Sequence, residues 1–291
     1  MFDKLTINVS RETFIHFYFH SRVWYNVFSI RCGVYIMSKI IAIANQKGGV
    51  GKTTTAVNLS SCLAVKGKKV LLIDIDPQGN TTSGLGIDKS GIKKSIYDVI
   101  VNDLPIKETF IETKVKNLIL SPSNIQLAGA EVELVSVISR ETRLKFALQE
   151  VKDDFHYIII DCPPSLGLIT VNALTAANTV LVPIQCEYYA LEGLSMLMKT
   201  VELVQRHLNP ELKVEGVVLT MFDARTNLSI QVVDEVKKFF GNKVYRTIIP
   251  RNVRLSEAPS YGLPIILYDN KSKGAECYME LADEVIEYSG V

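Results

Sequence analysis

The sequence has no excess of either charge, since its 291 residues carry 32 lysines and arginines against 31 aspartates and glutamates. A protein that coats nucleic acid with its whole surface needs a strongly basic composition, so this class is excluded. Any site for a polyanion must therefore be a local patch. A disordered chain is excluded as well, because 47% of the residues are hydrophobic and can form a full core.

Cysteine pairs and membrane-length apolar runs are also missing. The five cysteines form no CxxC pair and no cluster with histidine, which is typical of small buried thiols in a reducing cytosol. No apolar run reaches the ~20 residues of a membrane span, because Arg22, Asn26 and Arg31 interrupt the only candidate. These absences favour a cytoplasmic protein without a metal cluster.

Aromatic residues are spread unevenly. Residues 1–36 hold nine of the 24 aromatic side chains, including the only tryptophan, Trp24. The composition therefore separates an N-terminal segment, residues 1–36, from a main body, residues 37–291. No internal repeat and no linker rich in proline or glycine divides the main body further.

Short β-branched runs alternate with amphipathic segments along the main body. The strand candidates are 40–44, 70–75, 118–120, 157–160, 180–182, 214–219 and 244–248. The helix candidates are 53–65, 95–101, 139–151, 166–177, 191–207, 230–240 and 275–288. This order predicts an α/β fold with a mostly parallel, twisted sheet and helices on both faces. Such sheets bind ligands at the carboxyl ends of their strands.

A glycine-rich loop follows the first predicted strand and leads directly into a helix. It consists of Lys47, Gly48, Gly49, Val50, Gly51, Lys52, Thr53 and Thr54. The glycines let backbone N–H groups turn toward phosphate oxygens, and the helix N-terminus adds its positive end. Lys52 is placed to contact the β- and γ-phosphates, and the Thr53 hydroxyl to ligate Mg²⁺. The pattern predicts a phosphate-binding loop.

This loop departs from the general pattern at one position. Gln46 stands where the general pattern has glycine, and a second lysine, Lys47, follows it. A second ammonium group inside so tight a loop is poorly explained as a surface charge. One alternative is that Lys47 serves a nucleotide held by another subunit.

Two further carboxylates are expected at the same edge of the sheet. Asp161 ends an apolar strand, which is the placement that lets an acid reach the Mg²⁺ shell. Asp74 is expected at the buried end of another strand, and Asp76 follows it in a turn. Asp76 is our candidate for positioning the attacking water; taken alone, it is equally well explained as a turn residue.

These motifs together resemble the ParA/MinD ATPases, P-loop NTPases with a deviant Walker A box, and within them the chromosomal ParA branch of Soj-like proteins. Residues 47–54 resemble the deviant Walker A box, residues 74–80 the Walker A′ motif and residues 161–165 Walker B. The further matches are 185–193, 220–226 and 250–260. The resemblance covers residues 37 to 291.

The resemblance implies ATP and Mg²⁺ as cofactors and an ATP-dependent homodimer with two nucleotides at its interface. Lys47 would then reach the partner's phosphates, while Lys52 and Thr53 hold phosphate and Mg²⁺. Asp76 would support the hydrolytic water, and Asp161 would be the Walker B acid. The residues that match the family's adenine-contacting loop are Pro250, Arg251 and Asn252.

The resemblance also implies a function in chromosome or plasmid partitioning. In this family the dimer, but not the monomer, binds double-stranded DNA without sequence preference, and Arg225 and Arg254 match the DNA-contacting arginines. A ParB-type centromere-binding protein would stimulate slow ATP hydrolysis and release the ATPase from the nucleoid. Without the resemblance, each arginine is more simply explained as a solvated or ion-paired surface residue.

Two other functions compete with this one. A MinD-like, membrane-associated division regulator ends in a basic amphipathic helix, whereas residues 276–288 here carry an acidic face. A metabolic enzyme on the same scaffold, such as an amidoligase or the nitrogenase iron protein, needs a substrate pocket or cluster-binding cysteines. The sequence offers no candidate pocket residues, and Cys162 and Cys186 do not lie in the iron protein's motifs.

Residues 1–36 match nothing in the family, whose members begin near the equivalent of Met37. They are a real extension, an anchor for a membrane or partner, or an upstream region read from a start codon set too early. Residues 8–13 can be encoded by AATGTTTCACGTGAAACA, which contains the palindromic centromere site that ParB partners of this family recognise. We therefore hypothesise that translation begins at Met37, which the nucleotide sequence of the gene decides.

Overall fold

The computed structural model describes residues 38–187 and 192–289. They belong to the second of two units into which the chain divides, Tyr35–Val291. The predictions made for residues 1–36 lie outside this described part.

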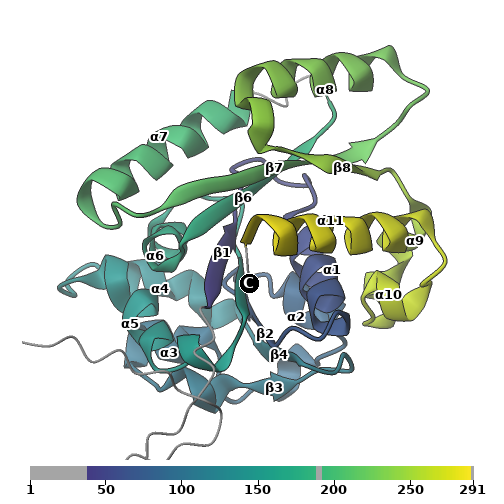
Figure 1. The fold of residues 1–291 in the computed structure, drawn as a ribbon. Coiled ribbons are helices and arrows are strands. Elements are labelled where there is room, and N and C mark those ends of the chain that lie inside the picture. The colour runs from purple at the N-terminus through teal and green to yellow at the C-terminus, as the bar shows by residue number, and fades with distance from the viewer. Residues whose placement is uncertain (1–37, 188–191, 290–291) are drawn as a thin grey trace, which may run out of the picture. The chain divides into compact units, whose positions relative to one another are not determined.

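An eight-stranded sheet forms the centre of the fold, in the order β3-β4-β2-β5-β1-β6-β7-β8 (Figure 1). Its strands are β1 (Lys39–Ile43), β2 (Val70–Asp74), β3 (Ile111–Glu112), β4 (Leu118–Ser121), β5 (Tyr157–Asp161), β6 (Thr179–Gln185), β7 (Lys213–Phe222) and β8 (Val244–Pro250). All neighbours pair in parallel except β3, which runs antiparallel to β4. The seven predicted strands are confirmed. Only β3 was missed, because two residues give no periodicity.

Helices cover both faces of this sheet, as the apolar strands predict (Figure 1). They are α1 (Lys52–Val65), α2 (Asn80–Gly84), α3 (Ile96–Asn102), α4 (Ala130–Glu133), α5 (Arg143–Gln149), α6 (Leu168–Ala176), α7 (Glu192–His207), α8 (Asn227–Phe240), α9 (Val253–Glu257), α10 (Ile265–Tyr268) and α11 (Lys273–Ser289). Alternate residues of one strand enter separate cores. Leu71 and Ile73 belong to the core that also contains buried residues of α3, α5, α6, α7 and α8, whereas Leu72 belongs to the core that contains those of α1 and α11.

The predicted helix at 139–151 is shorter than expected. Ser139 has a φ of 58°, a left-handed conformation through which a helix does not continue, and the chain first makes a 3₁₀ turn, Arg140–Thr142, before α5 begins. The sequence pattern also missed α2, α4, α9 and α10. Each has four or five residues, too few for an apolar face to repeat.

The C-terminal helix α11 is part of the core. Its apolar residues Leu281, Ala282 and Val285 are fully buried beside α1 and β8. Its Glu284 carboxylate accepts hydrogen bonds from the backbone N–H groups of Arg246 and Thr247 in β8, at 2.8 Å each. No helix in the described part of the chain is long and apolar enough to cross a membrane. Four of the five cysteines lie in this part, and all four are buried and free, as predicted.

Candidate functional site

The glycine-rich loop connects β1 to α1 at the carboxyl edge of the sheet. Gly49 and Gly51 have φ values of 75° and 88°, which turn the backbone sharply before the helix. No side chain caps the N-terminus of α1 and no acidic residue lies in its first turn, so its N–H groups are available to an anion.

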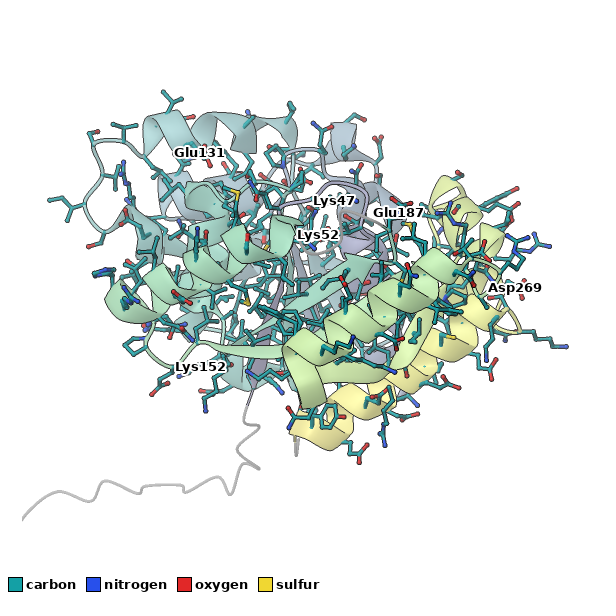
Figure 2. All side chains as sticks on the ribbon, turned by 90° about the horizontal axis from the view of Figure 1, so that it is seen from above. Lys47, Lys52, Glu131, Lys152, Glu187 and Asp269 are labelled. Atoms are coloured by element: carbon teal, nitrogen blue, oxygen red, sulfur yellow. The ribbon has the colours of Figure 1, made fainter. Side chains whose placement is uncertain are left out.

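Lys52 lies deep in this loop and Lys47 at its rim (Figure 2). The Lys52 side chain is buried, and its Nζ donates to the Lys47 carbonyl oxygen at 3.0 Å. Burial lowers the pKa of Lys52, while Asp161 and Asp76 favour its charged form. The Lys47 ammonium instead lies 3.8 Å from the exposed carboxylate of Glu187, which also pairs with Arg251 at 3.5 Å. The two lysines therefore occupy different positions relative to the loop.

Asp161 joins residues from three motifs. Its Oδ2 accepts hydrogen bonds from the hydroxyls of Thr53 at 2.8 Å and Thr81 at 2.7 Å. Its Oδ1 is fully buried and has no hydrogen-bond partner among the described residues. A buried carboxylate oxygen without a partner is costly unless a ligand satisfies it. Together with the Thr53 hydroxyl, this oxygen fits a Mg²⁺ ion held through its coordinated water.

Asp74 lies beside Asp161, because β2 and β5 are parallel and pair these two residues in register. Both side chains are fully buried. Burial raises the pKa of each carboxyl, and the neighbouring carboxylate raises the pKa of Asp74 further. Two adjacent buried carboxylates repel each other, so a cation at this place would relieve both the burial cost and the repulsion.

Asp76 lies in the turn after β2, as the sequence indicates. It is buried, its Oδ1 accepts from the backbone N–H of Gln78 at 2.9 Å, and its own N–H donates to Asp74 at 3.1 Å. The Gly79 N–H closes the turn on the Asp76 carbonyl oxygen at 2.8 Å. The turn thus holds Asp76 next to the phosphate loop.

A pocket of about 300 Å³ opens next to the loop, between the ends of β7 and β8. Its walls include Gly51, Thr220, Met221, Leu255 and Tyr278, together with the three residues predicted to contact adenine, Pro250, Arg251 and Asn252. The side-chain Oδ1 of Asn252 caps α9 by accepting from the backbone N–H groups of Arg254 and Leu255. The pocket is partly apolar and adjoins the phosphate loop, so it fits a flat base.

The two candidate DNA-contacting arginines are exposed and ion-paired. Arg225 makes two hydrogen bonds to the Asp223 carboxylate, at 2.8 and 2.7 Å. Arg254 pairs with Glu257 at 2.9 Å and with Asp269 at 3.5 Å. In the isolated chain, both side chains are therefore ion-paired surface residues, which is the simpler of the two explanations that the sequence offers.

Three residues that sequence reasoning missed support the phosphate loop. Asn45 accepts from the Lys47 N–H at 3.0 Å and donates to the Pro183 carbonyl oxygen in β6 at 2.7 Å. The Thr220 hydroxyl donates to the Val50 carbonyl oxygen at 2.8 Å. Thr81, described above, is the third. Asn45 directly follows the predicted strand 40–44 and precedes Gln46. A polar residue at the end of a buried strand was the feature of the sequence that could have indicated its role.

Known proteins match the chain over most of its length. Residues 38–214 match a family described as AAA domain. The sporulation initiation inhibitor protein Soj of Bacillus subtilis is 66% identical over 249 residues, which cover 86% of this chain and 98% of Soj. The chromosome partitioning protein ParA of Myxococcus xanthus is 56% identical, covering 86% of this chain and 89% of that protein. The chain belongs to the ParA/Soj family.

A solved structure with a bound nucleotide has the same fold as this chain. It is a crystal structure of cobyrinic acid a,c-diamide synthase from Mycobacterium smegmatis with bound ADP and magnesium. It is 39% identical, has a TM-score of 0.78, and covers 87% of this chain and 96% of its own. The predicted fold class of the ParA/Soj family is therefore confirmed for this chain.

The buried carboxylate pair predicts a pH-dependent effect of Asp161→Asn. Burial raises the pKa of Asp161 to about 6, so between pH ~4 and this value the folded protein binds more protons than the unfolded chain. Stability is therefore lost as the pH rises through this window, and the loss is complete above it. We expect Asp161→Asn to raise the melting temperature of the nucleotide-free protein at pH 8, and the difference to close toward pH 4. Thermal unfolding at several pH values measures this effect. Asp153→Asn, at an exposed position, is the control, and a gain that does not vary with pH would contradict the interpretation.

Proposed function

We propose that this protein is an ATPase of chromosome or plasmid partitioning that dimerises around ATP and binds DNA as a dimer. The position of Lys47 carries the proposal. Lys52 already supplies a buried ammonium to the phosphate loop of its own chain, whereas Lys47 lies at the rim, with its side chain 33% exposed. A cation so placed is available to phosphates bound by a second copy.

The chemistry follows from the residues around the loop. Backbone N–H groups and Lys52 bind the phosphates of ATP, and Thr53 and Asp161 hold Mg²⁺, which neutralises developing charge on the phosphates. Asp76, fixed by its turn, orients the attacking water. We propose that hydrolysis is slow in the isolated protein, because completion of the site requires Lys47 of a second copy and a ParB-type partner.

DNA binding by the dimer follows from charge. The whole chain is near neutral, and Arg225 and Arg254 are each paired with acids of the same chain. In a single copy, these two arginines are therefore already occupied by acids of their own chain. A dimer that presents Arg225 and Arg254 of both chains on one face has twice as many arginines near the DNA. The DNA phosphates can then replace the acidic partners of these arginines. The dimer would thus lie on the nucleoid, within the cytoplasm, and return to solution after hydrolysis.

The two rival functions find less support. A membrane-associated regulator needs an amphipathic helix whose apolar face is free, but the apolar face of α11 is buried in the core. The diamide synthase is 39% identical to this chain, whereas the partitioning relatives are 66% and 56% identical. Partitioning is therefore the function that we propose.

Lys52→Ala and Asp76→Ala should separate binding from hydrolysis. Lys52→Ala removes the buried ammonium and should abolish ATP binding, dimerisation and DNA binding together. Asp76→Ala should leave ATP binding intact but lower the hydrolysis rate by about 100-fold or more, which traps a DNA-bound dimer. Nucleotide binding, solution mass and phosphate release measure these steps. Rapid hydrolysis by Asp76→Ala would contradict the assignment.

Arg254→Ala should weaken DNA binding without affecting the nucleotide. Because phosphate contacts do not read sequence, affinity should fall equally for different DNA sequences, and the salt dependence of binding should become shallower. Arg206→Ala is the control, since Arg206 is also exposed and paired with an acid, Glu202, but lies at the far end of α7. Unchanged DNA affinity of the ATP-bound Arg254→Ala dimer would exclude this role.

A further inference from the structure

The short helix α2 is connected to both buried carboxylates of the nucleotide site. The Thr81 hydroxyl donates to Asp161 at 2.7 Å. Thr82 donates twice to Asp74, from its N–H at 2.8 Å and from its hydroxyl at 2.7 Å. Both threonines are fully buried. A change in the position or charge of the carboxylates, which face the Mg²⁺ site, therefore acts directly on α2.

The chain after α2 makes a close backbone contact with the segment that follows the Arg254 helix. Gly86 ends the α2 turn, and Gly262 ends the 3₁₀ turn η7 (Ala258–Tyr261). A Cβ atom on Gly262 would lie 2.5 Å from the Gly86 Cα, and a Cβ on Gly86 would lie 2.8 Å from the Gly262 carbonyl oxygen. Real Cβ atoms do not approach so closely, so the two backbones touch in a way that only glycine permits.

Beside this contact, α2 also packs against η7, and a cavity lies next to their packing. The cavity has a volume of about 210 Å³ and lies between α1, α2 and η7, with Asn80, Ser83 and Pro259 among its lining residues. Motion of α2 would therefore reach η7 through this packing and, without side chains between, through the backbone contact of Gly86 with Gly262. Figure 1 shows α1, α2, α9 and α10 on the same side of the sheet.

On the other side of the contact, Arg254 and Gly262 belong to one continuous segment. α9 runs directly into η7, so Arg254 lies eight residues before Gly262 in a chain without an intervening loop. The segment is anchored at a second point, where the buried Asn58 of α1 accepts from the Ile265 N–H at 2.7 Å. Leu255 of α9 packs tightly on Gly274 of α11. These contacts fix the position of the segment relative to α1 and α11, so a shift at Gly262 would have to be taken up by α9 and η7 between them.

We propose that the Gly86–Gly262 contact couples the nucleotide site to the surface that carries Arg254. ATP and Mg²⁺ set the position of α2 through Asp161 and Asp74, and the contact passes this position to η7 and α9. The arrangement of Arg254 with its acidic partners Glu257 and Asp269 then depends on the bound nucleotide. The inference rests on the proposed function, since it assigns a route by which ATP controls DNA binding.

Alanine at either glycine should uncouple the two sites. In Gly86→Ala and Gly262→Ala, we expect the ratio of DNA affinities with ATP and with ADP to fall roughly fivefold or more, the lower range of allosteric coupling. ATP affinity should stay within about twofold of wild type, and the MgATP form should still have the mass of a dimer. Gly67→Ala is the matched control: Gly67 also has a positive φ, of 84°, but a Cβ there meets nothing within 4 Å. Wild-type ratios in both test variants would overturn the proposal.

Amide hydrogen exchange of the wild-type chain tests the coupling even if the variants fold poorly. Exchange in residues 253–262 should differ between the MgATP and MgADP forms, and identical exchange in this segment would overturn the proposal. The measurement needs no DNA. If wild type bound DNA equally well with ATP and ADP, the proposed function would fail, while the exchange difference would still decide whether the contact couples α2 to α9.

Discussion

The buried carboxylate of Asp161 is the interaction on which the rest of the site depends. It accepts hydrogen bonds from Thr53 of the phosphate loop and Thr81 of α2, and it lies in register beside Asp74. Three motifs that are far apart in the sequence meet here because β1, β2 and β5 are adjacent and parallel, so that their carboxyl ends share one edge. The fold thus places two carboxylates that repel each other at one buried position, with one Asp161 oxygen that has no hydrogen-bond partner among the described residues. A divalent cation bound there would reduce both the repulsion and the cost of burial.

Basic side chains inside the site and on the surface are likewise close to acids of the same chain. Lys52 is desolvated next to Asp161 and Asp76, and Arg225 and Arg254 are paired with acids of their own chain. Under the proposed function, these two arginines become available to DNA when ligand and a second copy change their pairings. Near-neutral composition, which excludes a protein that coats nucleic acid, is therefore compatible with a patch created by assembly.

The sequence predicted those parts of the fold that depend on long periodic runs. Seven strands and the long helices were located because buried parallel strands are continuously apolar. The four short helices were missed, and two of them carry residues that the proposals use: α2 carries Thr81 and Thr82, and α9 carries Arg254. Of the site, the phosphate loop and its aspartates could be read from local patterns. The supporting roles of Asn45 and Thr220 could not, because each depends on a contact with a residue brought near only by folding.

Sedimentation of the full-length wild-type chain, with DNA binding measured in the same samples, tests the central claim most directly. The account predicts one copy, of 32.4 kDa, with MgADP or without nucleotide, and two copies with MgATP. DNA binding should rise with the dimer fraction as the protein concentration increases. A chain that stays monomeric with MgATP and still binds DNA, or a dimer that forms equally with MgADP, would contradict the account.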